Sequence, residues 1–232
     1  MSLQLRLNEH YTSVQGEGPH VGELTQFVRF SGCNMRCPGW PCDTPHAIFP
    51  EFWKNDPKVD AVELAARCSE ERYRTGARRI CLTGGEPLLQ DKDGLRALVM
   101  FMCEADLVID IFSNGSFVYP EWLMREPRVT IIMDWKLPGS GEADTRIEER
   151  YTNLRQLRAT DAVKFVVTNL DDLNYANALW REWHYVRATP YVGAAWNKIS
   201  DIDIVQYIKE NQLRWVLNVQ LHKHIWGDVR GV

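Results

Sequence analysis

Several features that mark other classes of protein are missing from this sequence of 232 residues. No uncharged apolar stretch approaches the roughly 18 residues of a transmembrane helix, and the N-terminus lacks the basic, apolar and small-residue pattern of a secretion signal. There is no run of about five or six like charges, and the formal net charge is only −4. These absences predict a cytoplasmic protein with no electrostatic hold on membranes or nucleic acid, and therefore a small substrate.

Linkers, low-complexity segments and internal repeats are also missing. A chain of 232 residues with 45% apolar composition can bury a large core, and this length suits one α/β domain better than two. We therefore expect residues 1–232 to form a single domain.

Strand-like and helix-like patterns alternate along the chain. Runs with β-branched or alternating apolar residues predict strands at 24–31, 79–82, 107–112, 129–134, 162–167, 184–189 and 214–219. Apolar residues spaced three or four apart predict helices at 60–74, 91–104, 144–158, 171–183 and 200–211. Asp91, Asp171 and Ser200 are the expected helix caps. This alternation predicts an α/β fold, a partial (β/α)6-type barrel of mostly parallel strands.

Polar and glycine-containing segments follow the expected strands. They are Cys33 and the segments 84–87, 113–115, 134–136, 168–169, 189–191 and 220–223. Because the carboxyl ends of parallel strands meet at one edge of a sheet, the site is expected there. The segment 32–58, rich in Pro, Gly and aromatic residues, is too long for an ordinary strand-to-helix connection and is expected to be functional.

The six cysteines divide into a triplet and three single residues. Cys68, Cys81 and Cys103 lie within helix or strand patterns and are expected to be small buried apolar side chains. Without a secretion signal a disulfide framework is not expected. The triplet Cys33, Cys37 and Cys42 is therefore the candidate metal site.

The triplet allows two metal sites. Structural zinc takes four closed ligands, and His46 could supply the fourth. An iron–sulfur cluster bound by three thiolates would instead leave one iron without a protein ligand. An open iron of this kind can bind and break a substrate.

Three cysteines after the first expected strand, followed by Gly84-Gly85-Glu86-Pro87 after the second, resemble the radical S-adenosylmethionine (SAM) superfamily. The usual spacing there is Cys-x3-Cys-x2-Cys, whereas the second gap here is x4. The resemblance implies a [4Fe–4S] cluster on Cys33, Cys37 and Cys42, in the loop at about 32–58. It also implies SAM on the open iron, cleaved by one electron to a 5'-deoxyadenosyl radical.

The stretches "HYTSVQGEGPHVG", "FVRFSGCN", "CDT", "LTGGEP" and "VQLHKHIWGDVRGV" together resemble the 7-carboxy-7-deazaguanine synthase family. This resemblance implies a radical SAM lyase that contracts the ring of 6-carboxy-5,6,7,8-tetrahydropterin with loss of ammonia, in queuosine or other 7-deazapurine biosynthesis. It further implies Mg²⁺, a flavodoxin-like or other electron donor and a homodimer.

The side chains present suit such a substrate. Gln15 and Glu17 match the donor and acceptor edge of a pterin, and Arg29 suits a carboxylate. The resemblance assigns Thr44 to Mg²⁺, with indirect help from Asp43. Expected substrate contacts are Gln15, Gly16, Glu17, Arg29, Thr83, Gln220 and His222. For SAM, the resemblance implies contacts from Gly85, Glu86, Ser113, Asp134, Trp135, Lys136, Thr189, Pro190, Tyr191 and Val192.

One SAM segment departs from the family pattern. Relatives more often carry Ser-Pro-Lys where this chain has Asp134-Trp135-Lys136, so Trp135 could pack on adenine or fill the core.

Two alternatives stay open. A glycyl-radical-enzyme activase shares the Gly-Gly-Glu-Pro loop and the compact size, but it gives no reason for the segment 15–18 or the His222 tail. A non-catalytic zinc or iron–sulfur module would explain the triplet alone.

Overall fold

The computed structural model describes residues 3–40, 42, 44–227 and 229–231. The strands are β1 Gln4–Val14, β2 Leu24–Phe30, β3 Lys58–Asp60, β4 Arg79–Gly84, β5 Val108–Ser113, β6 Val129–Trp135, β7 Ala162–Val167, β8 Thr189–Ala194 and β9 Val216–Leu217. The helices are α1 Pro45–Ile48, α2 Pro50–Trp53, α3 Ala61–Thr75, α4 Lys92–Glu104, α5 Glu121–Arg125, α6 Ile147–Gln156, α7 Leu170–Glu182, α8 Asp201–Glu210 and α9 Leu221–Trp226. Short 3-10 turns are η1 Gly18–His20, η2 Pro87–Leu89 and η3 Pro138–Ser140.

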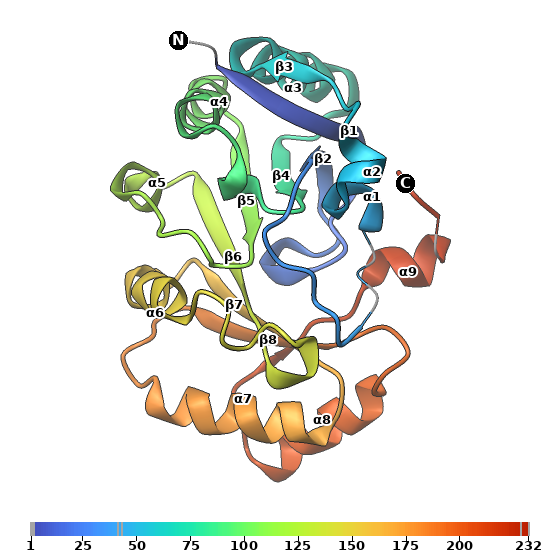
Figure 1. Cartoon of the computed structure of the whole chain (residues 1–232), viewed down its shortest axis with the longest axis vertical. Coiled ribbons are helices and arrows are strands. Elements are labelled where there is room, and N and C mark those ends of the chain that lie inside the picture. Colours follow the sequence, from blue (N-terminus) through green and yellow to red (C-terminus); the bar gives the residue numbers. More distant parts are fainter. Residues whose placement is uncertain (1–2, 41, 43, 228, 232) are drawn as a thin grey trace.

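The strands form one sheet in the order β3-β1-β2-β4-β5-β6-β7-β8-β9. Every neighbouring pair from β2 to β9 is parallel, whereas β1 runs antiparallel to both β2 and β3. Figure 1 shows α3 to α8 around the outside of this sheet, with the segment after β2 and helix α9 on its inner side. The predicted α/β class with a mostly parallel sheet is confirmed.

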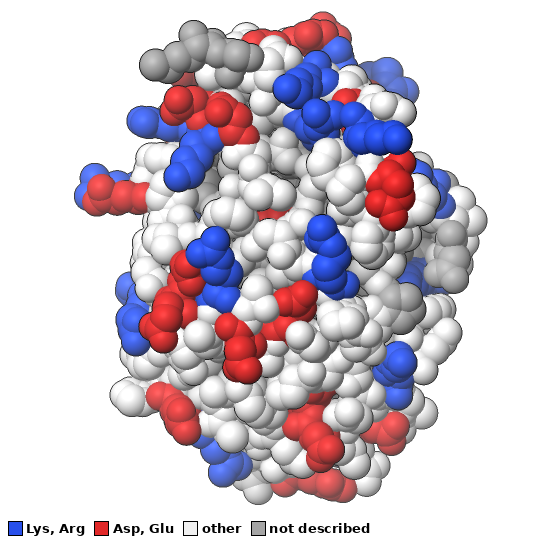
Figure 2. Space-filling model, in the orientation of Figure 1, with Lys and Arg blue, Asp and Glu red and all other residues white. Residues whose placement is uncertain are grey.

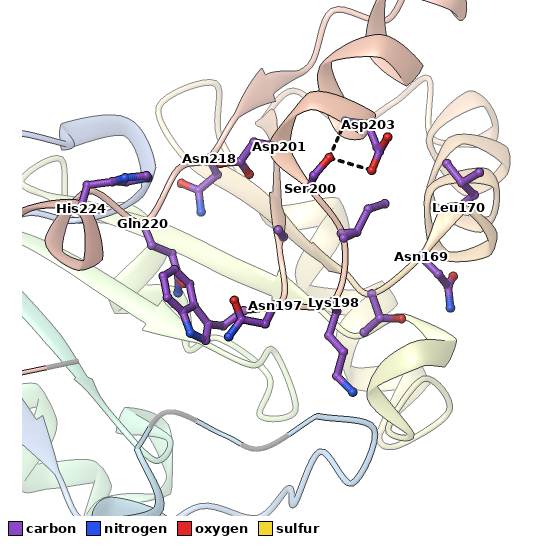
Figure 3. A pocket seen from close by; sticks show the side chains of 14 residues that line it. Asn169, Leu170, Asn197, Lys198, Ser200, Asp201, Asp203, Asn218, Gln220 and His224 are labelled. Carbon is purple, nitrogen blue, oxygen red and sulfur yellow. Dashed lines mark hydrogen bonds between the residues drawn. The ribbon is translucent and has the colours of Figure 1, made fainter. Parts of the chain in front are cut away.

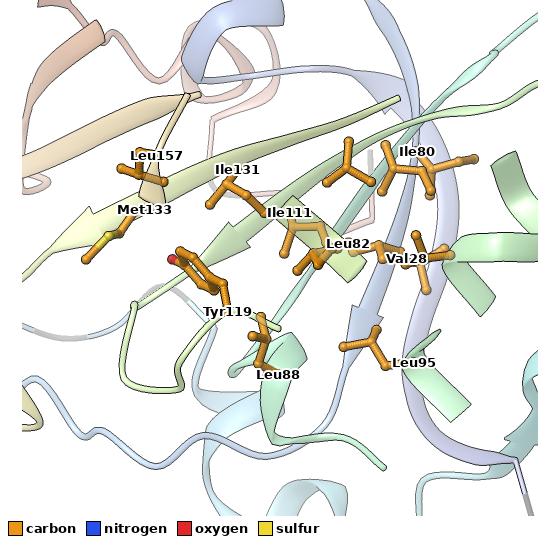
Figure 4. Packing of buried hydrophobic residues seen from close by; sticks show 14 of the residues in the cluster. Val28, Ile80, Leu82, Leu88, Leu95, Ile111, Tyr119, Ile131, Met133 and Leu157 are labelled. Atoms are coloured by element: carbon orange, nitrogen blue, oxygen red, sulfur yellow. The ribbon is translucent and has the colours of Figure 1, made fainter. Parts of the chain in front are cut away.

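An apolar core lies between the sheet and the outer helices. Figure 4 shows Leu82, Ile111 and Ile131 from successive strands packed together, with Leu88 and Leu95 from the helical side. All five side chains are buried. The β-branched and leucine-rich strand runs therefore match the requirement of a parallel sheet that is covered on its faces.

The charged side chains show no single-sign patch on the face drawn in Figure 2, where acidic and basic residues are interspersed. None of the described helices is long and apolar enough to cross a membrane.

Most predicted elements are present, but one strand was placed wrongly. The stretch 184–189 is a turn after α7, and the strand β8 begins at Thr189, where it pairs with Ala162. Within this stretch Tyr185 is exposed and Val186 is half-buried, and the N–H of Val186 donates to the carbonyl of Trp183 at 2.9 Å, which closes a turn instead of a strand. The last expected strand, 214–219, is reduced to Val216–Leu217.

The strands β1 and β3 were not predicted. Strand β1 carries "NEHYTS" in its second half, and most of these side chains are half-buried and polar, so the apolar alternation that marks a strand is lost.

Two of the three predicted helix caps are confirmed. The side chains of Asp91 and Ser200 accept the backbone N–H groups of Gly94 and Asp203 at 2.7 and 3.1 Å. Asp171 is not a cap, because Asn169 accepts the N–H of Asp172 at 2.9 Å and begins helix α7.

Candidate active site

A cleft of about 650 Å³ opens inside the curved sheet, toward the carboxyl ends of its parallel strands. Strands β2 and β4 to β8 form its floor, the loop after β2 covers one side, and the segment after β1 and the C-terminal tail cover the other. This is the edge at which the sequence predicted the site.

The three predicted cluster ligands all line this cleft. Cys33, Cys37 and Cys42 are free thiols. Burial raises the pKa of Cys33, and it raises that of Cys37 to about 11. Thiolates at these positions therefore need a positive partner, which iron supplies. The donor set, three soft sulfur ligands on one cavity, suits an iron–sulfur cluster.

No group of three or more His, Cys, Asp or Glu side chains in the described part of the chain is arranged around a single metal-ion position. His46, the alternative fourth zinc ligand, lies with its Nε2 3.6 Å from Glu9 Oε2.

The glycine loop after β4, residues 84–87, packs against residues 30–33, where the cysteine loop begins. The N–H of Gly85 donates to the carbonyl of Phe30 at 3.1 Å, and that of Glu86 to the carbonyl of Gly32 at 2.8 Å. A Cβ atom on Gly85 would lie 2.0 Å from the oxygen of Gly32, so only glycine allows this approach.

Glu86 lies beneath the cleft. Its carboxylate accepts the backbone N–H groups of Leu88 and Asn114 at 3.0 and 2.7 Å. Burial raises the pKa of Glu86 to about 7, despite these hydrogen bonds. Its observed role is to join the loops after β4 and β5.

The end of β6 brings a buried ion pair to the cysteines. Lys136 Nζ lies 2.9 Å from Asp134 Oδ2 and 5.7 Å from the ring centroid of Trp40. Burial opposes the charge on Lys136, but Asp134 and Cys37 outweigh it and raise the pKa. The second oxygen of Asp134, Oδ1, is buried and has no hydrogen-bond partner among the described residues, so it can accept a ligand donor.

The opposite end of the cleft is polar. Lys164 and Gln220 both donate to the carboxylate of Glu17, Gln220 at 2.9 Å. Burial opposes ionisation of Glu17, but Lys164 and these hydrogen bonds lower its pKa to about 2. Gln15 is 2% exposed, and its Nε2 has no hydrogen-bond partner in the described part of the chain. An ionised acceptor and an unpaired amide donor therefore lie close in sequence at one end of the cleft.

Arg29 already contacts a carboxylate. Its Nε lies 2.9 Å from Glu9 Oε2, and Arg230 pairs with the other oxygen of Glu9. The rings of Tyr11 and Phe27 stack beside them with centroids 5.1 Å apart.

The structure brings most of the predicted site residues together. Those that line the cleft are Gln15, Gly16, Glu17, Arg29, Cys33, Cys37, Cys42, Thr44, Thr83, Gly85, Ser113, Asp134, Lys136, Gln220 and His222. Those outside its walls are Glu86, Trp135, Thr189, Pro190, Tyr191 and Val192. Asp43 lies outside the described residues.

The residues outside the walls have physical reasons to be there. Trp135 is 1% exposed and packs against Trp183 and Tyr151, so it fills the core. The segment 189–192 is the body of strand β8, so the loop that reaches the cleft is 194–196 instead.

Several cleft residues were missed from the sequence. They are Glu9, Tyr11, Asn114, Lys164, Trp196 and Arg230. Only Lys164 carries a clear signal, since it is a lone charge inside the apolar strand "AVKFVV".

Comparisons with known proteins bear directly on this arrangement. The family model described as "4Fe-4S single cluster domain" matches residues 14–135. The 7-carboxy-7-deazaguanine synthase of Clostridium acetobutylicum is 33% identical over 99% of this chain and 100% of its own length. The chain belongs to the 7-carboxy-7-deazaguanine synthase family.

Further relatives of this family agree. The synthase of Methanospirillum hungatei is 33% identical over 97% of this chain and 86% of its own length. The crystal structure of QueE from Escherichia coli superposes with a TM-score of 0.70 at 21% identity, over 95% of both chains. The native structure of anSMEcpe with bound AdoMet superposes with a TM-score of 0.52 at 13% identity, over 81% of this chain and 61% of its own.

The predicted family is confirmed, and with it the radical SAM class and the use of a [4Fe–4S] cluster and SAM. The activase and the non-catalytic module are therefore not supported.

Proposed function

We propose that this chain forms 7-carboxy-7-deazaguanine from 6-carboxy-5,6,7,8-tetrahydropterin, by a radical SAM, Mg-dependent ring contraction with loss of ammonia. Membership of the 7-carboxy-7-deazaguanine synthase family supports the activity. The observation that carries the proposal is a single cleft with three cysteines at one side and the polar residues Gln15 and Glu17 at the other.

Cys33, Cys37 and Cys42 would hold the cluster. When bound, the cluster and SAM together supply a 5'-deoxyadenosyl radical. The chain itself excludes water and fixes the substrate, because the cleft is closed on one side by the cysteine loop and on the other by the tail.

SAM would be held near the end of β6. Gly85, Ser113, Asp134 and Lys136 line the cleft there, and the buried Asp134 Oδ1 offers an acceptor. A second cavity of about 740 Å³ adjoins the cleft and shares Ala194, Trp196 and Gln220 with it. Figure 3 shows this cavity between the loops after β7 and β8 and the tail, with Asn169, Lys198 and His224 around it. It meets the cleft at Gln220, and therefore at the polar end and not beside the cysteines.

The pterin would bind at the polar end. Glu17 is ionised and can only accept hydrogen bonds, and Gln15 Nε2 can donate one. Arg29 and Arg230 carry the positive charge that a substrate carboxylate requires, alongside Glu9. Thr83, Gly16 and His222 complete this end of the cleft.

Mg²⁺ is assigned to Thr44, whose Oγ1 lies 3.4 Å from Cys42 Sγ at the rim of the cleft. A single hydroxyl suits Mg²⁺ because this ion keeps several waters and takes substrate oxygens. A flavodoxin-like or other electron donor, a homodimer and one domain over residues 1–232 complete the proposal.

Anaerobic reconstitution tests the proposal. The protein should bind about four irons per chain and convert the pterin with SAM, a reductant and Mg²⁺, whereas Cys37→Ala should lose both cluster and product. Formation of 5'-deoxyadenosine without the deazaguanine would show that the substrate is wrong. A colourless protein with one zinc per chain would contradict the cluster.

A further inference from the structure

The extra residues between Cys37 and Cys42 dock on a turn that follows β6. The N–H of Gly39 donates to the carbonyl of Ser140 at 3.2 Å. A Cβ atom on Gly39 would lie 1.7 Å from the oxygen of Gly139, and one on Gly141 would lie 2.6 Å from the ring of Pro38. Pro38 and Gly39, in the longer gap, are therefore packed closely against this turn.

Glu142, at the end of this turn, contacts the cysteine loop directly. Its Oε1 accepts the backbone N–H of Arg36 at 2.8 Å and that of Cys37 at 3.4 Å. Its Oε2 accepts the hydroxyl of Thr145. Cys37 has a φ of 46°, a left-handed conformation that costs a non-glycine residue about 1 kcal/mol. The two hydrogen bonds that Glu142 accepts therefore stabilise the backbone at Cys37, where the conformation is unfavourable.

The turn is itself held from beneath by Arg150, a fully buried side chain. Its guanidinium donates to the carbonyls of Lys136 and Glu142, both at 3.4 Å, and to that of Ala143. It lies over the ring of Trp135, 4.9 Å from the centroid. Trp135 therefore supports the cation that fixes the turn.

We propose that Glu142 is a positioning residue for the cluster ligand Cys37, and that the turn 138–142, fixed by Arg150 on Trp135, is the seat of the longer ligand loop. The two departures from the family pattern, the x4 gap and Asp-Trp-Lys, are then structurally linked. The loop with the x4 gap packs on the turn 138–142, and Trp135 of Asp-Trp-Lys supports the Arg150 side chain that holds this turn. The inference rests on the proposed function only in taking Cys37 as a cluster ligand.

Three variants distinguish two effects of Glu142: its hydrogen bonds to the cysteine loop and its negative charge near the cluster. Glu142→Ala removes both acceptor and charge, so iron should pass to a chelator about tenfold faster, the equivalent of about one charge-assisted hydrogen bond. Glu142→Gln keeps an acceptor oxygen, so its iron release should stay near wild type while its midpoint potential rises as in Glu142→Ala. Glu149→Ala is the matched control, because Glu149 is an acidic residue of the nearby helix α6 that pairs with Arg146.

The measurements are iron release to a chelator and the midpoint potential of the reconstituted holoenzyme. The expected pattern is fast release for the alanine variant only, and a raised potential for both Glu142 variants. Release within twofold of wild type in Glu142→Ala, or equal acceleration in Glu149→Ala, would overturn the inference. A wild-type protein that binds no cluster would instead contradict the proposed function.

Discussion

Lys164 and Glu17 show how one buried ion pair defines the pterin end of the cleft. Lys164 lies in the middle of β7, where a charge is costly unless it is paired, and its Nζ contacts Glu17 and lies 6.0 Å from the centroid of Phe112. Burial opposes ionisation of Glu17, but Lys164 lowers the pKa of this carboxyl. The pair therefore fixes Glu17 as an acceptor before any substrate arrives.

We expect Lys164→Met to leave Glu17 buried without its cation. The free energy of unfolding should fall by about 3 kcal/mol, and kcat/KM for the pterin should fall at least about tenfold. Urea unfolding and steady-state kinetics measure these two effects. Lys92→Met, on the exposed surface of α4, is the control and should change neither.

Glu86 makes the free energy of unfolding fall as pH rises, whereas a paired surface carboxylate makes it rise. Burial raises its pKa from 4.5 to about 7, so its contribution is fully present below pH 4.5 and is lost as pH rises through 7. The shift corresponds to roughly 3 kcal/mol at about 1.4 kcal/mol per pKa unit.

Glu86→Gln stays neutral at every pH and tests this effect. The free energy of unfolding of the wild type, relative to that of Glu86→Gln, should fall between about pH 4.5 and about pH 8. Urea unfolding of the cluster-free chain across this range measures it. A constant difference would show that the Glu86 pKa is not raised.

At the scale of elements, the sequence predicted what depends on local periodicity. The helices α3, α4, α6, α7 and α8 and the parallel strands β2 and β4 to β7 follow their apolar spacing, because one face of each meets the core. Strand β1 was not predicted because polar residues lie on both of its faces: Glu9 and Tyr11 line the cleft, whereas Thr12 donates to Glu71 of α3. Strand β8 was displaced because the apolar residues of the stretch 184–189 lie mostly in a turn, which the N–H of Val186 closes on the carbonyl of Trp183.

The same limit applies to the site. The cysteine loop, the glycine loop and Gln15–Glu17 were predictable because each is a contiguous motif in one loop. Glu9, Lys164 and Arg230 come from separate elements and meet only through sheet pairing and the path of the tail, which no local pattern encodes.

The cap of α7 gives an element-scale prediction. Because Asn169 and not Asp171 accepts the N–H of Asp172, Asn169→Ala should lower the free energy of unfolding by about 1 kcal/mol. Asp171→Ala should cost less than about half of that, since it loses only a favourable charge at the helix start. Thermal or urea unfolding compares them, and equal losses would contradict the assignment of the cap.

At the scale of the whole molecule, the segment after β1 and the C-terminal tail join at one side of the cleft. The carbonyl of Gly16 accepts the N–H of Leu221 at 2.9 Å, and the N–H of Gly18 donates to Asn218 Oδ1 at 2.7 Å. The contact between Glu17 and Gln220 spans 203 positions in sequence. The pterin end of the cleft is thus built from both ends of the fold.

Gly16→Ala should disturb this junction. A Cβ atom there would lie 2.2 Å from His222 Nδ1, so the tail must shift and the Kd for the pterin should rise about tenfold or more. Binding by calorimetry measures it. Gly76→Ala, at the end of α3 with open space around it, should lower stability without changing this Kd. An unchanged Kd in Gly16→Ala would show that His222 does not depend on this packing.

Because this junction joins both ends of the fold, the pterin end of the cleft can form only late in synthesis of the chain. Synthesis runs from the N-terminus at about 5–20 residues per second, so the segment 15–18 leaves the ribosome well before the residues 216–231 that complete it. Strands β1 to β8 and helices α3 to α8 precede that last segment in the chain, whereas β9, α9 and the rest of the tail are made last. A chain released before the tail is translated lacks Gln220 and His222, so we expect it to lose pterin binding.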